Sequence, residues 1–100
     1  MSILITEVNV TPIKPQDGLV AFASVVLNES IYLSSIAVYT RPDGSYRLLY
    51  PTKKLGDRIM NLFHPISREA SRQIEVAIFK RCEEIFERSY DGQEKVNLQG

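Results

Sequence analysis

Several residue types are scarce in this chain of 100 residues, and each scarcity argues against a class of protein. The one cysteine, Cys82, cannot form an internal disulfide, which indicates a cytoplasmic protein. No apolar run approaches the roughly 18 residues that a membrane-spanning helix needs. The N-terminal stretch "MSILITEV" has neither the basic region nor the long apolar segment of a signal peptide. We therefore expect a protein without a membrane partner.

Catalytic and metal-binding groups are equally scarce. The one histidine, His64, lacks the partner groups that general acid–base catalysis requires. Cys82 falls on the apolar stripe of a predicted helix, a position typical of a buried packing residue. No Cys, His or carboxylate residues have the spacing of zinc ligands, and the five glycines are scattered rather than grouped in a phosphate-binding loop. The sequence thus predicts no enzyme, cofactor, metal or small-molecule substrate.

The composition is that of an ordinary globular domain, but its charge is unevenly distributed. Hydrophobic residues make up 44% of the chain and charged residues 24%, which is typical of one folded domain. The net charge is zero, yet residues 41–81 contain nine basic and four acidic residues. Such a basic middle indicates an anionic partner. The alternative is that these charges are solvated and scattered over the surface.

Four segments have the composition of β-strands and are bounded by turn residues: 3–14, 19–27, 31–40 and 45–50. The connections "PQDG", "NES" and "RPDG" are short, so the strands should be consecutive and antiparallel. Residues 51–63 are ambiguous, because Lys53, Lys54 and Gly56 resemble a loop. The following "RIMNLF" fits either a short edge strand or a helical turn. The sequence predicts a small antiparallel sheet of four to five strands.

A helix is predicted from Ser67 to about Ser89. Ser67 is a suitable N-cap. An apolar stripe follows at helical spacing, widened by two phenylalanines: Ile74, Ile78, Phe79, Cys82, Ile85 and Phe86. Asp91 and Gly92 signal a helix stop. We therefore predict one α+β domain over residues 1–90 and a polar C-terminal tail over residues 91–100.

The predicted strand 19–27 is apolar on both of its alternating faces. Leu19, Ala21, Ala23, Val25 and Leu27 lie on one side. Val20, Phe22 and Val26 lie on the other. A strand in a two-layer monomer needs only one apolar face. A second cover is expected, either from more of the same chain or from a partner subunit, and we predict a homodimer.

Four segments also resemble a known family. They are "AFASVVLNESIYLSSIAVY", "YPTKK", "HPIS" and "IEVAI", and they occur in this order between about Ile5 and Phe86. The chain resembles the stage V sporulation protein G (SpoVG, septation protein) family, whose pattern includes A-I-A-S-I-T-L, M-P-S-K-R and H-P-I-N. No single motif is decisive, whereas the ordered set is fairly specific.

The resemblance implies a small antiparallel sheet with a C-terminal helix, assembled as a homodimer. It also implies a nucleic-acid-binding regulator linked to septum formation and sporulation in bacteria. DNA is the family's usual ligand, and RNA is also attributed to it. Lys53 and Lys54 match the basic pair of the family loop, and His64, Pro65 and Ile66 match H-P-I.

Given the nucleic-acid binding that the resemblance implies, a binding surface is predicted around the joint between sheet and helix. Its candidates are Lys53, Lys54, Arg58, Arg68 and Arg72, with Tyr46 and Arg47 flanking them. Arg68 and Arg72 are four residues apart and share one face of the helix, whose N-terminus also attracts phosphate. In the alternative interpretation, the arginines pair with Asp57, Glu69 and Glu75.

His64 leaves three roles open at this stage. It precedes Pro65, so its backbone favours an extended conformation. We interpret it first as a residue of the sheet–helix joint, second as a phosphate contact, and last as a catalytic group.

For the whole chain, the first hypothesis is a dimeric nucleic-acid-binding regulator, and the second is a dimeric protein-interaction module that binds no nucleic acid. Salt-dependent binding to DNA and RNA would separate this hypothesis from the first.

Overall fold

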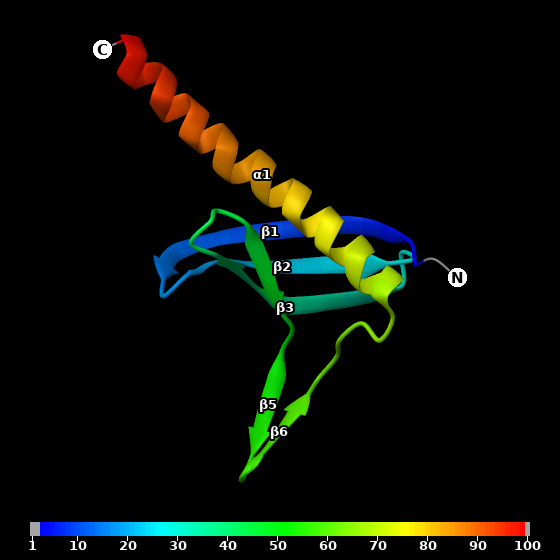
Figure 1. Cartoon of the computed structure of the whole chain (residues 1–100). Coiled ribbons are helices and arrows are strands. Elements are labelled where there is room, and N and C mark those ends of the chain that lie inside the picture. Colours follow the sequence, from blue (N-terminus) through cyan, green and yellow to red (C-terminus); the bar gives the residue numbers. More distant parts are fainter. Residues whose placement is uncertain (1–2, 100) are drawn as a thin grey trace.

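The computed structural model describes residues 3–99, and describes side chains for residues 3–86. The chain forms six strands and then one long helix (Figure 1). The elements are β1 (Ile5–Gln16), β2 (Leu19–Leu27), β3 (Ile31–Thr40), β4 (Tyr46–Leu49), β5 (Thr52–Leu55), β6 (Arg58–Asn61) and α1 (Arg68–Gln99). The α+β class predicted from the sequence is confirmed.

The first four strands form one antiparallel sheet in the order β1-β2-β3-β4. Tight turns join them, as the short connections predicted. Asp17 and Gly18 both have positive φ, of 52° and 89°, which matches the two-residue turn that suits the twist of a β-hairpin. At the next turn, the Ser30 amide donates to the Leu27 carbonyl at 2.9 Å. These turns place neighbouring segments of the chain side by side.

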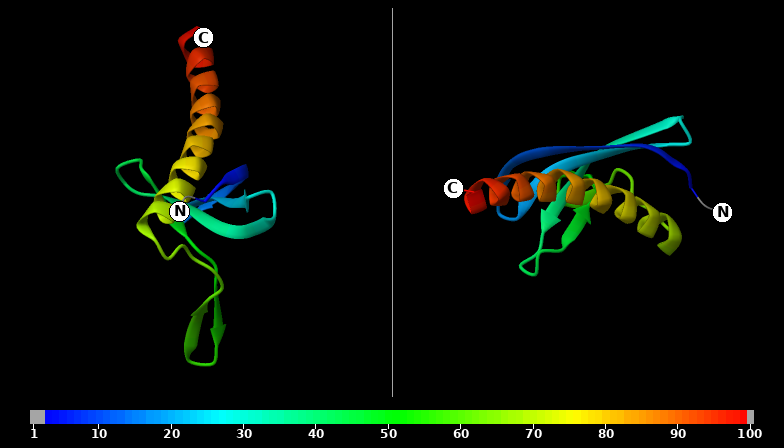
Figure 2. Two further views of the ribbon diagram at one scale, coloured as in Figure 1. Left: turned by 90° about the vertical axis from the view of Figure 1, so that its right-hand side faces the viewer. Right: turned by 90° about the horizontal axis from the view of Figure 1, so that it is seen from above.

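Residues 52–61 form a separate two-stranded sheet, β5 paired with β6. This corrects the prediction of a loop at Lys53 and Lys54, and it resolves the choice for residues 58–61 in favour of a strand. The hairpin turn is Gly56–Asp57, and Gly56 has a φ of 62°, as expected for glycine at the first position of such a turn. The hairpin projects from the body of the molecule and points away from the helix (Figures 1 and 2).

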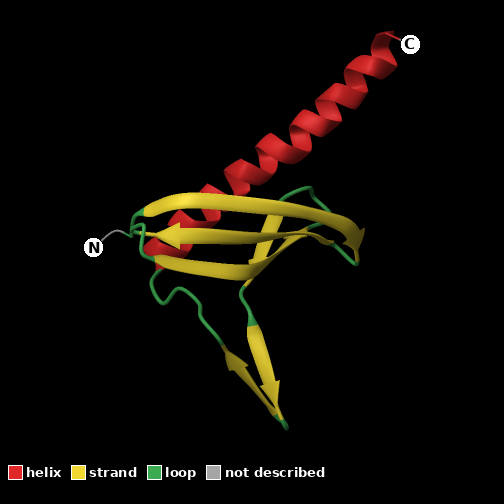
Figure 3. Cartoon of the chain, turned by 180° about the vertical axis from the view of Figure 1, so that it is seen from behind, coloured by secondary structure: helices red, strands yellow, loops and turns green. Residues whose placement is uncertain are grey.

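Helix α1 crosses one face of the four-stranded sheet, as the view from behind shows clearly (Figure 3). The helix begins as predicted. The Ser67 hydroxyl accepts a hydrogen bond from the Ala70 amide at 3.1 Å, and the Ser71 amide donates to the Ser67 carbonyl at 3.0 Å. Such a cap satisfies one of the amide groups that a helix leaves without an internal partner.

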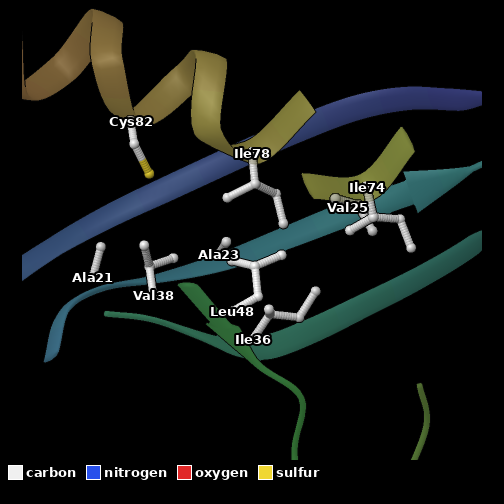
Figure 4. Packing of buried hydrophobic residues seen from close by; sticks show 9 residues of the cluster. All are labelled: Ala21, Ala23, Val25, Ile36, Val38, Leu48, Ile74, Ile78 and Cys82. Carbon is white, nitrogen blue, oxygen red and sulfur yellow. The ribbon is translucent and has the colours of Figure 1, made fainter. Parts of the chain in front are cut away.

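The hydrophobic core lies between α1 and this sheet face (Figure 4). Its helical members are Ile74, Ile78 and Cys82, all buried as the stripe predicted. The sheet contributes Ala21, Ala23, Val25, Ile36, Val38 and Leu48. The small alanines of β2 leave room for the helix to lie close to the strands. Burial raises the pKa of the Cys82 thiol to about 11, with a smaller contribution from Glu83.

The helix does not end where the sequence predicted. It continues past Asp91 and Gly92 to Gln99. One glycine in a helix costs only about 1 kcal/mol relative to alanine. No proline follows to remove a backbone hydrogen bond. The stop signal at Gly92 was therefore too weak to end the helix.

The opposite face of the four-stranded sheet has no cover among the described residues. One row of paired residues crosses all four strands on this face: Thr11, Phe22, Ala37 and Leu49. Phe22 is 41% exposed and Leu49 45% exposed. Val20 was predicted to lie on this face, but it packs against the core instead, beside a register irregularity between Leu19 and Ala21. We call the surface formed by Phe22, Val26, Tyr32, Ala37 and Leu49 the open sheet face.

Candidate nucleic-acid interface

Three of the five predicted contact residues lie on the projecting hairpin. Lys53 and Lys54 are in β5, and Arg58 begins β6. All three are exposed. Directly paired residues of an antiparallel ribbon share a face, and successive residues alternate between faces. The pairs Lys53–Met60 and Leu55–Arg58 therefore share one face, and Lys54–Ile59 lies on the other. Both faces of the hairpin carry positive charge.

The other two predicted residues, Arg68 and Arg72, lie on the first turns of α1 and are also exposed. Arg72 lines an open, mainly apolar groove between the helix and the start of the chain. A hydrogen bond of 3.2 Å from the Ile3 amide to the Gln73 side-chain oxygen holds the start of the chain against the helix. This groove belongs to the body of the molecule, whereas the hairpin extends away from it (Figure 2).

The five basic residues thus form two groups, one on the hairpin and one on the helix. The segment 62–67 connects the groups along the chain. Within residues 3–86, no ion pair joins any of the five to an acidic side chain. The ion pair found there links Arg81 Nη1 to Glu84 Oε1 at 3.5 Å. The pairing of Arg58 with Asp57, which the alternative interpretation expected, is absent, so the hairpin cations are available to an external anion.

Tyr46, which was expected to flank the site, packs into the body instead. Its ring centroid lies 5.8 Å from that of Phe79 and 6.3 Å from that of Phe86. Arg47, the next residue, is exposed and pairs with Tyr39 across the β3–β4 ladder. Side chains alternate along a strand. Arg47 therefore lies on the open sheet face, away from Tyr46.

His64 lies in the joint between the hairpin and the helix. Its Nδ1 is 3.2 Å from the Pro65 carbonyl oxygen, a contact within the same short segment. The ring is exposed at the edge of a small hollow of about 220 Å³, which Tyr50 and Phe63 also line. The rings of Tyr50 and Phe63 meet edge to face at 6.1 Å. This placement matches the first of the three roles considered for His64, that of a joint residue.

Tyr50 shows how apolar this joint is. Its hydroxyl oxygen is buried and has no hydrogen-bond partner among the described residues. Burial raises the pKa of Tyr50 to about 12, and the charge of Glu75 adds to the effect. The hydroxyl therefore remains protonated at neutral pH. It supplies neither a base nor a negative charge to the surface beside it.

The described part of the chain offers no arrangement suited to a metal ion, because no three His, Cys, Asp or Glu side chains gather in it. Within residues 3–99, no helix is both long and apolar enough to cross a membrane. What remains as a candidate site is the surface of exposed basic residues.

The sequence did not predict the exposed apolar side chains Leu55, Ile59 and Met60 on the β5–β6 hairpin. The dipeptide Gly56–Asp57, a known hairpin turn pair, was the signal that could have found them.

The fold defines a class of small α+β protein in which one helix covers one face of a four-stranded sheet and a basic hairpin projects from the edge. Comparison with known proteins makes this class specific. The SpoVG family model matches residues 3–84. The chain therefore belongs to the SpoVG family, as its resemblance indicated.

Two relatives agree with this assignment. The chain is 34% identical over 85 residues to a septation protein SpoVG of Finegoldia magna, and the match covers 84% of this chain and 78% of that protein. It is 30% identical over 77 residues to a septation protein SpoVG of Treponema denticola, where the match covers 76% of this chain and 82% of the relative. Both relatives are named for a role in septation.

Proposed function

We propose that this protein is a dimeric nucleic-acid-binding regulator that acts in the cytoplasm and is linked to septum formation and sporulation. The single observation that supports binding is the β5–β6 hairpin, with three exposed cations that have no acidic partner within residues 3–86. Phosphate backbones are the partner that such unpaired cations suit best. Membership of the SpoVG family and the names of two relatives support the link to septation.

Binding is tested by titrating DNA and RNA at several salt concentrations. If Lys53 and Lys54 contact phosphates, the variant Lys53→Glu/Lys54→Glu should bind more weakly. Each lost contact should lower the slope of log affinity against log salt by about 0.9 for duplex DNA or about 0.7 for single strands. The matched control is Lys14→Glu/Lys80→Glu, which changes the net charge equally at two exposed lysines of β1 and α1.

The control should retain most of the affinity and the parental salt slope. Because the hairpin residues are exposed, the Lys53→Glu/Lys54→Glu variant should keep its fold, which circular dichroism checks. If both variants lose affinity equally, binding depends only on net charge. If neither changes it, the site lies away from the hairpin.

Dimerisation is supported by the open sheet face. Phe22 and Leu49 flank Ala37, which is buried although nothing among the described residues covers that face. Exposed apolar surface of this kind marks an interaction site. Phe22→Asp should shift the protein to a monomer, because the dimer would bury an unpaired carboxylate. Sedimentation velocity measures the mass. Val76→Asp is the control, since Val76 is 59% exposed on α1, which covers the opposite face of the sheet, and this variant should keep the parental mass.

The same face supports the second candidate, a protein-interaction module without nucleic-acid binding. In that case Phe22→Asp would abolish capture of a protein partner, while no form of the protein would bind DNA or RNA. A monomeric parent protein at micromolar concentration would contradict the dimer in either hypothesis.

A further inference from the structure

The β5–β6 hairpin is exposed along its whole length. Every residue from Thr52 to Leu62 is exposed, and among the described elements β5 and β6 pair extensively only with each other. An isolated two-stranded hairpin is only marginally stable in water. A ribbon that projects in this way (Figures 1 and 2) is suited to gain its order from a partner.

The two faces of this ribbon differ. One face has Lys53, Leu55, Arg58 and Met60, which are two cations and two apolar side chains. The other has Thr52, Lys54, Ile59 and Asn61. Leu55 and Arg58 are the last pair before the turn at Gly56–Asp57, so the first face carries its apolar and guanidinium groups to the tip. Leu55 is 48% exposed and Met60 51% exposed.

We propose that this hairpin enters the major groove of a B-form DNA duplex with its Lys53–Leu55–Arg58–Met60 face toward the bases. The inference rests on the proposed function and names its ligand class. The major groove is about 12 Å wide and admits a two-stranded β-ribbon. In this mode Arg58 donates to a guanine edge, Leu55 and Met60 contact thymine methyl groups, and Lys54 reaches a phosphate from the opposite face.

The residues of the ribbon favour duplex DNA over other nucleic acids. Single strands are bound largely by stacking bases on aromatic rings, and residues 52–61 contain none. The major groove of an RNA duplex is deep and narrow, so side chains cannot read it. An arginine fork and apolar groups are the chemistry that distinguishes base edges in the DNA major groove.

A second copy of the chain is the other occupant to consider for the apolar side chains. The ribbon carries Lys53, Lys54 and Arg58 against one carboxylate, Asp57. Two ribbons brought together across a two-fold axis would therefore repel each other, whereas a duplex concentrates negative charge on both walls of its groove. Charge complementarity thus favours DNA as the partner of the hairpin. The second copy of the chain is proposed to bind at the open sheet face instead.

The test uses the full chain and three probes of random sequence: DNA duplexes, the corresponding single strands, and RNA duplexes. Fluorescence anisotropy at fixed salt gives the affinity, and selection from the duplex pool gives the base preference. The parent should bind DNA duplexes most tightly. Arg58→Ala and Met60→Ser should each weaken that binding by about tenfold and relax the preference at one base position.

Ile59→Ser is the matched control on the same strand. Ile59 is 72% exposed, more than Met60, and lies on the opposite face of the ribbon. Its substitution should change the affinity by less than about twofold, because the groove reads only the first face. All three side chains are exposed, so the variants should keep the parental fold and circular dichroism spectrum.

Three results would overturn the inference. Equal or tighter binding to single strands or RNA duplexes would contradict binding in the DNA major groove. Equal losses of affinity for Ile59→Ser and Met60→Ser would contradict the assignment of the first face to the bases. A fall in sedimenting mass for Met60→Ser with unchanged DNA affinity would show that the hairpin contacts a second copy of the chain instead of DNA. Failure of every probe to bind the parent would instead contradict the proposed function itself.

Discussion

The body of the molecule and its β5–β6 hairpin contain similar apolar residues but place them in opposite environments. Ile36 and Ile78 in the body are fully buried, whereas Ile59 in the hairpin is 72% exposed. In the body, Ile36, Ile78 and the other core residues are explained by what they pack against within the chain. In the hairpin no such explanation exists among the described residues. The sequence of the hairpin is therefore better explained by a molecule outside the chain.

The largest difference between the two regions is expected when the same residue type is shortened in both. Ile78→Ala should lower the free energy of unfolding by about 2–5 kcal/mol, because it leaves a cavity between α1 and the sheet. Ile59→Ala should change it by less than about 0.5 kcal/mol, because the side chain is already in water. Urea denaturation measures both. A comparable loss for Ile59→Ala would show that the hairpin is packed in solution.

The body was predictable from the sequence because several signals agree there. Asp17–Gly18 marks a turn, and Ala21, Ala23 and Val25 alternate on the side that meets the helix. Ser67 caps α1, and the helical spacing from Ile74 reaches Cys82 within the core. Local preference and tertiary packing favour the same structure at each of these positions.

The hairpin was not predictable in the same way, because neither of its faces is buried. Lys53, Lys54, Ile59 and Met60 show no alternation of polar and apolar residues, and that alternation arises only when one face packs on a core. The candidate site could be predicted as a set of exposed cations, but not as two groups. Their separation depends on the direction in which the hairpin projects, and residues 51–63 carry no signal for that direction.

A second test measures how the stability of the body depends on pH. The thiol of Cys82 is buried in the body, and its pKa is raised from about 9 to about 11. A raised thiol pKa contributes stability that is fully present below pH 9 and is lost as the pH rises to about 11, because the unfolded chain ionises first. The loss attributable to Cys82 should be about 2–3 kcal/mol. Denaturation of the parent and of Cys82→Ala across this range measures the difference.

The two proteins should converge in stability at high pH, since alanine has no proton to lose. Tyr50 titrates in the same direction in both, with a pKa of about 12, and so cancels in the comparison. Parallel stability curves between pH 9 and pH 11 would contradict a buried thiol in the core.

The smallest expected change in the free energy of unfolding comes from substituting one turn glycine in each region. Gly18 has a φ of 89° in the β1–β2 turn, where an added Cβ would lie 3.4 Å from the Thr40 carbonyl oxygen. Gly18→Ala should lower the free energy of unfolding by about 1–2 kcal/mol, the cost of a left-handed conformation for a non-glycine residue. Gly56→Ala imposes a similar strain at a φ of 62°, with nothing within 4 Å of the new Cβ.

The two substitutions should nevertheless act on different equilibria. Because the hairpin contributes little to the packing of the body, Gly56→Ala should leave global unfolding within about 0.5 kcal/mol of the parent. It should instead accelerate amide hydrogen exchange across the hydrogen-bonded Lys53–Met60 and Leu55–Arg58 pairs, which report local opening. Gly18→Ala should leave exchange in those pairs unchanged relative to global stability. If Gly56→Ala destabilises the whole protein as much as Gly18→Ala does, the hairpin and the body unfold as one unit, and the contrast between them does not hold.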